Sequence, residues 1–115
     1  MAIIKSYTDL EQSKKLAEIL PLESADGWWT ALNWQETEYY IEVKQDGINK
    51  PKKYVPCWSL TALLSILHDY TLQTNTDGTV FVVCESQKPM ISDAYDNPVD
   101  ACVAMIEKLY ELKML

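Results

Sequence analysis

The chain has 115 residues, 17 of them acidic and 10 basic, and its formal net charge at pH 7 is -7. Every basic residue is lysine, and because arginine supplies the fork that clamps phosphates and reads guanine edges, no direct phosphate contact with nucleic acid is expected. The length predicts a single domain over residues 1–115, and no membrane-length apolar run or signal peptide is evident, so we expect a cytoplasmic protein without membrane contact.

The first predicted element is a helix over residues 8–20. Thr8 and Glu11 match a capping box, in which each side chain satisfies a backbone donor of the first turn. Apolar residues such as Leu16 recur on one face, and Pro21 ends the helix.

Strands are predicted where apolar and polar residues alternate between turn signals. All three glycines follow an aspartate, and Asp-Gly pairs favour tight turns because both residues tolerate positive φ. The alternation over 37–44 predicts one buried and one solvated face, and the apolar run within 79–85 is typical of a central strand. The predicted strands cover residues 28–32, 37–44, 54–55, 70–74 and 79–85, with a possible edge strand in 89–94 and a hairpin around Asp77-Gly78.

The uncharged stretch from Pro56 to Leu67 predicts a central core helix. Its leucines recur at i, i+3, i+4 and i+7, and Ser59 is a suitable N-cap. Trp58 is expected to tie the aromatic-rich first half of the chain to this helix. A last helix is predicted to begin after Asn97, an N-cap followed by proline at the first helical position.

The predicted order is helix, strands, helix, strands, helix. Clustered strands joined by short turns favour antiparallel pairing. We therefore expect an α+β domain, with a small and mainly antiparallel sheet and about three helices packed on it.

The sequence offers little for catalysis. Cys57 precedes the central helix and could be a thiolate nucleophile, but His68 would lie at the far end of that helix, roughly 15 Å away at 1.5 Å per residue. Pairs of His68 with Cys84 or Cys102 stay open. The three cysteines and one histidine lack metal-ligand spacing, and Glu36, Glu38 and Glu42 fit a solvated strand face. No catalytic residue, metal site or cofactor is predicted.

The aromatic residues are the candidate binding site. Adjacent Trp28 and Trp29 point to opposite sides of a strand, so we expect at least one indole to be exposed or to line a groove. The alternative is that these rings fill the core. The predicted patch consists of Trp28, Trp29, Trp34, Tyr39 and Tyr40.

Several phrases of the chain resemble a family of small uncharacterised proteins from gut bacteria and their phages or mobile elements. They are Leu16-Ala-Glu-Ile-Leu-Pro21, Ser24-Ala-Asp26, Pro56-Cys-Trp-Ser-Leu60 with Ala62-Leu-Leu64, and Asn97-Pro-Val-Asp-Ala101. In that family a proline often follows the central helix where this chain has His68, which argues further against a catalytic His68. The resemblance implies no activity or cofactor; it implies a phage-like setting in which small acidic proteins often bind other proteins.

The combined expectation is a protein that works by binding another protein. An acidic nucleic-acid mimic that blocks a DNA-binding partner is a second hypothesis, and it requires carboxylates along one face. An enzyme that uses Cys57 and a homo-oligomeric role are the remaining alternatives.

Overall fold

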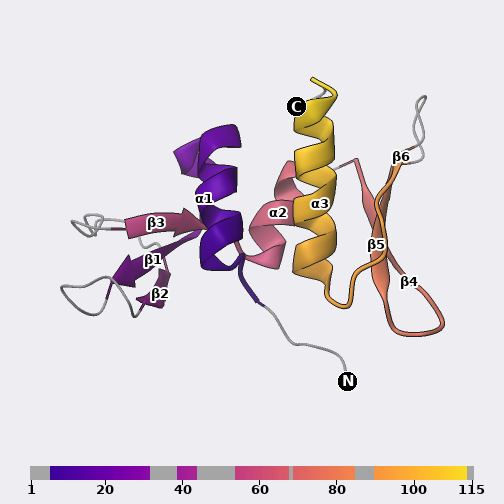
Figure 1. Ribbon diagram of the computed structural model, residues 1–115, viewed down its shortest axis with the longest axis horizontal. Helices are drawn as coiled ribbons and strands as arrows, with labels where there is room; N and C mark the ends of the chain where they lie inside the picture. The colour runs from indigo at the N-terminus through magenta and orange to yellow at the C-terminus, as the bar shows by residue number, and fades with distance from the viewer. Residues whose placement is uncertain (1–5, 32–38, 44–53, 68, 85–89, 114–115) are drawn as a thin grey trace.

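The computed structural model describes residues 6–31, 39–43, 54–67, 69–84 and 90–113, which form three α-helices and two antiparallel sheets (Figure 1). The α+β class is confirmed, but the strands form two sheets of three rather than one. The helices are α1 (Leu10–Ile19), α2 (Leu60–Ile66) and α3 (Pro98–Glu111), with a short 3-10 helix η1 (Leu22–Ser24). The strands are β1 (Gly27–Ala31), β2 (Tyr39–Val43), β3 (Tyr54–Cys57), β4 (Thr71–Thr74), β5 (Val80–Cys84) and β6 (Met90–Ile91).

The helices lie between the two sheets (Figure 1). The first sheet has the order β2-β1-β3 and lies beyond α1, whereas the second has the order β4-β5-β6 and lies beyond α3. The molecule is accordingly elongated, with principal extents of 46 × 33 × 24 Å. The two ends of the molecule thus present different sheet edges to solvent.

The second sheet follows the sequence prediction closely. β4 and β5 pair antiparallel, with Thr74 opposite Val80, and Gly78 in the connecting turn adopts φ 90°, which strongly favours glycine. β5 is central and β6 is a two-residue edge strand. The predicted hairpin and the central strand are both confirmed.

β2 only partly follows its predicted alternation. Ile41 is half-buried, but Val43 is 59% exposed although it was expected on the buried face. Val43 lies opposite Gly27, which has no side chain to cover it. The buried face of this strand is therefore incomplete at its end.

Two of the three predicted helix starts are confirmed. Ser59 Oγ accepts from the Ala62 amide, and Asn97 caps α3 in the same way. α1, however, begins with Asp9 and Gln12 as its capping box rather than Thr8 and Glu11.

Thr8 does not cap α1 because its side chain makes tertiary contacts. Thr8 is fully buried, its Oγ1 lies 2.7 Å from Ser13 Oγ, and it accepts from the Trp58 amide at 3.2 Å. Because this hydroxyl links α1 to the segment that enters α2, it is not available to cap α1.

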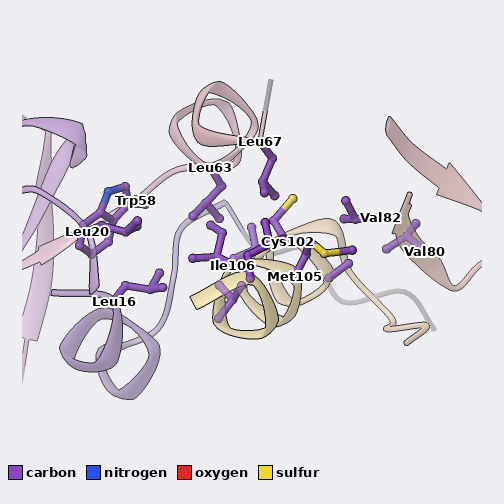
Figure 2. Close-up of a cluster of buried hydrophobic side chains, with 14 of the residues drawn as sticks. Leu16, Leu20, Trp58, Leu63, Leu67, Val80, Val82, Cys102, Met105 and Ile106 are labelled. Carbon is purple, nitrogen blue, oxygen red and sulfur yellow. The ribbon is translucent and has the colours of Figure 1, made fainter. Parts of the chain in front are cut away.

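The main core joins the three helices to β5 (Figure 2). Trp58 is fully buried against this cluster, and its Nε1 donates to Ser24 Oγ at 2.9 Å. Ser59, the next residue, donates from its amide to Asp26 Oδ1 at 2.8 Å. The expectation that Trp58 ties the first half of the chain to the core helix is confirmed. The labelled members in Figure 2 are Leu16, Leu20, Trp58, Leu63, Leu67, Val80, Val82, Cys102, Met105 and Ile106.

Gly27 lies where β1 approaches β3 and the N-terminal segment. A Cβ atom at this position would lie 2.9 Å from Cys57 Sγ and 3.2 Å from both Glu42 O and Tyr7 Cε1. The close packing of these three neighbours therefore requires a residue without a side chain.

Replacing Gly27 with alanine is expected to lower the free energy of unfolding by about 1–3 kcal/mol, because the methyl group overpacks this contact. Adding Cys57→Ala removes the nearest atom, so the double variant should lose less than the sum of the two single variants. Urea denaturation of all four proteins measures the coupling. Strict additivity would show that the Gly27–Cys57 contact is not the source of the strain.

Candidate functional site

The five predicted aromatic residues do not share one surface. In the β1–β2 register Trp28 lies opposite Glu42 and Trp29 lies opposite Ile41, so the two indoles project from opposite faces of the sheet. Tyr40 shares the face of Trp28, and Tyr39 shares the face of Trp29. Trp34 lies outside the described residues.

Neither described indole is widely exposed. Trp28 is 8% exposed and meets the Tyr54 ring edge-on, with centroids 4.7 Å apart and an interplanar angle of 77°. Trp29 is half-buried and donates from Nε1 to Thr8 O at 3.0 Å. Both indole rings make contacts that stabilise the fold. Among the described aromatic residues of β1 and β2, only Tyr40 is classed as exposed, at 38%.

The two thiols whose side chains the structure describes, Cys57 and Cys102, are poor nucleophiles. Cys57 is fully buried, and burial, followed by the nearby Asp26 carboxylate, raises the pKa of its thiol to about 12. Burial raises the pKa of Cys102 to about 11. Because the thiolate is the reactive form, both groups are inert at neutral pH. His68 and the Cys84 side chain lie outside the described residues.

A surface groove follows the outward side of α3. It consists of three adjoining hollows that all include Glu107 in their walls. α1 forms one side, and the segment between β6 and α3 forms the other. We call this feature the acidic groove, after its charged residues Asp9, Glu11, Lys15, Glu18, Asp93, Asp100, Glu107, Lys108 and Glu111.

The first turns of α1 and α3 form one end of the acidic groove, which we call its lower end. Gln12 Nε2 donates to Asp100 Oδ1 at 2.8 Å, and Asn97 Nδ2 donates to Asp100 Oδ2 at 2.8 Å. Carboxylates are favoured in the first turn of a helix, because they face the positive end of its dipole. The Asp100 carboxylate is therefore held in a defined position.

The middle and upper parts of the acidic groove combine charge with apolar surface. Val103, Ala104 and Tyr95 line the lower and middle parts, and Ile19 and Tyr110 line the upper part. Tyr110 is 51% exposed. The groove thus offers apolar contact area bordered by carboxylates.

Negative charge dominates the acidic groove. Its walls carry seven carboxylates against two lysines. One of those lysines, Lys108, donates from Nζ to Ile91 O at 3.2 Å. In the described part of the chain, no group of three or more His, Cys, Asp or Glu side chains could hold a metal ion. The carboxylates are spread along the groove rather than gathered at a point.

The sequence predicted single charged residues of this groove but not the groove itself. Glu18, Glu107 and Glu111 fall at outward positions of the predicted helices, which indicates solvated faces. What the sequence could not show is that α1 and α3, which are far apart along the chain, place these faces side by side.

Comparison of the chain with protein-family models, curated proteins and solved structures finds no match. Among the residues that the structure describes, no helix has both the length and the apolar character to cross a membrane.

Proposed function

We propose that this protein is a non-enzymatic binding module that holds a lysine- or arginine-rich segment of another protein in the acidic groove. The observation that carries the proposal is the ratio of seven carboxylates to two lysines around three adjoining hollows that share Glu107. A cationic segment is the occupant whose charge complements these walls.

The apolar part of the groove favours a protein segment over simple cations. Lysine and arginine side chains have long apolar stems, which pack on surfaces such as Ile19 while the charged head reaches a carboxylate. Tyr110 offers a ring face for a cation–π contact. Each exposed ion pair contributes only about 0–1 kcal/mol, so affinity requires several pairs together and falls as salt increases.

The nucleic-acid mimic is a second candidate function, favoured by the same arrangement of carboxylates along one groove. In that case the partner offers a DNA-binding face rather than a flexible basic segment. Both functions fit the phage-like setting implied by the sequence resemblance. Displacement of double-stranded DNA from the native partner would favour the mimic.

Reversing one charge at the centre of the acidic groove should weaken binding of a basic probe. We expect Glu107→Lys to reduce the affinity for a short fluorescein-labelled arginine-rich peptide by about tenfold at low salt, equivalent to 1.4 kcal/mol. Fluorescence anisotropy measures the binding, and circular dichroism confirms folding.

Glu23→Lys is the matched control, since Glu23 is exposed in η1 outside the acidic groove and the charge change is the same. A groove-specific site predicts a small effect for this control. Equal losses in both variants would mean that the peptide responds to net charge alone, and the proposal would be overturned.

A further inference from the structure

The outer edge of β2 differs from the described edges at β3 and β6. Within the described residues, β2 pairs with β1 on one side and with no strand on the other. Its sequence, Tyr-Tyr-Ile-Glu-Val, contains no proline and no lysine. An unpaired edge of this kind offers free backbone N–H and C=O groups to another strand.

The edges at β3 and β6 carry features that discourage pairing. β3 contains Pro56 and packs against α1. β6 is only two residues long, and its Ile91 carbonyl accepts from Lys108 Nζ at 3.2 Å. β4 is one residue shorter than β2 and carries a single apolar side chain, Leu72, so it offers less apolar surface to a second strand. Proline and lysine are common protection of sheet edges, and the described residues of β2 contain neither, with Glu42 as their one charged side chain.

The residues of β2 are complementary to themselves when the strand is reversed. With two copies antiparallel about Ile41, each Tyr40 faces Glu42 of the second copy, and each Tyr39 faces Val43. Within one chain Tyr40 already donates from its hydroxyl to Glu42 Oε1 at 2.6 Å. The same donor and acceptor would therefore meet across the two-fold axis on one face of the sheet.

The opposite face of β2 is also complementary to itself when the strand is reversed. It carries Tyr39, Ile41 and Val43, and Val43 is 59% exposed in the single chain. Pairing about Ile41 places Tyr39 of the second copy directly opposite Val43, and side chains in such cross-strand pairs lie about 4.5–5.5 Å apart. The second copy would thus cover the most exposed apolar residue of the strand.

We propose that β2 pairs with β2 of a second copy of this chain, antiparallel about Ile41, so that the two first sheets join into one six-stranded sheet. Such a contact is isologous, since the same strand serves on both sides. The paired strands are short and bury less than the roughly 1,200 Å² of standard interfaces, so the dimer is concentration-dependent. β2 lies beyond α1, away from α3 (Figure 1), and none of the residues that line the acidic groove belongs to β2, so dimerisation leaves the groove open.

Sedimentation equilibrium over a range of protein concentrations tests the pairing. The wild-type chain should shift from monomer to dimer as concentration rises. Tyr40→Glu places two carboxylates opposite each other at two points of the interface, and we expect it to raise the dissociation constant at least tenfold. Adding Glu42→Lys to that variant places opposite charges at the same two points and should restore the dimer.

The matched control is Leu22→Glu, which adds the same charge at a side chain of similar exposure, 40% against 38% for Tyr40. It should dimerise like the wild type, and circular dichroism verifies that every variant is folded. A monomeric wild type at all concentrations would overturn the proposal. So would a folded Tyr40→Glu/Glu42→Lys variant that stays monomeric, or equal disruption by Leu22→Glu.

Discussion

Replacing Trp58 with alanine is expected to lower the free energy of unfolding by about 3–5 kcal/mol, the range for large aromatic truncations in a core. Trp58 is fully buried and lies between the first sheet and the helices. Alanine leaves a cavity in this junction and also removes the donor to Ser24 Oγ, whose hydroxyl keeps its bond to Pro21 O. Because a domain of this size is stabilised by about 5–15 kcal/mol, this loss is a large fraction of the total stability.

Trp58→Phe is the informative comparison. Phenylalanine keeps most of the buried ring and loses the Nε1 hydrogen bond, so we expect a loss of about 1–2 kcal/mol. Urea denaturation followed by far-ultraviolet circular dichroism measures both variants, since tryptophan fluorescence changes with the substitution itself. Equal losses in the two variants would assign the stability to the hydrogen bond rather than to the packing.

Raising the pH above 9 is expected to destabilise the protein, with a limiting slope of about 1.4 kcal/mol per pH unit for each of the buried thiols Cys57 and Cys102. A thiol is neutral when protonated, and burial favours that form in the folded chain. The folded pKa is raised to about 12 for Cys57 and about 11 for Cys102, against 9.0 for an unperturbed thiol. Between pH 9 and 11 the unfolded chain therefore loses protons that the folded chain keeps, and stability falls as pH rises.

Urea denaturation from pH 7.5 to 10.5 under reducing conditions provides the measurement, with the unperturbed thiol pKa near the middle of that range. Cys102→Ala is the control, because other groups titrate here too, including Tyr7, whose pKa is raised chiefly by burial. In this variant the free energy of unfolding should fall less steeply with pH above 9, because one of the two buried thiols has been removed. An unchanged slope would show that the Cys102 thiol ionises equally in the folded and unfolded chains.

The sequence predicted best what depends on neighbouring residues. Ser59 and Asn97 cap their helices as expected, because a hydroxyl or amide three residues before a free amide is a local arrangement. The turn at Gly78 and the apolar run of β5 are local in the same sense. These features specify element type without knowledge of the partners.

Features that depend on distant residues were predicted less well. Thr8 does not cap α1, because its hydroxyl contacts Trp58, fifty residues later in the chain. The burial of Trp28 depends on Tyr54, which only strand pairing brings near. Which strands share a sheet is likewise set by packing, so the division into two sheets was not visible in the pattern.

The candidate site was predictable only in fragments. Glu18 and Glu107 could be placed on solvated helix faces, but the groove between them arises from the docking of α1 beside α3. The aromatic residues drew more attention because their chemistry is distinctive in a sequence. Carboxylates on helix surfaces are common, and their function becomes visible only when two helices are placed together.

The order of the elements along the chain has a consequence for synthesis. Strands β1–β3 pair only among themselves in the described structure, and so do β4–β6, so each sheet can form soon after its own residues are made. α3 is the last described element, yet it supplies Cys102, Met105 and Ile106 to the core, and Gln12 of α1 bonds to Asp100 across 88 residues. Until α3 arrives, the nascent chain exposes the apolar faces of α1 and α2. Translation therefore passes through a stage at which both sheets can form without a completed core, and we expect protection from aggregation to be needed most at that stage.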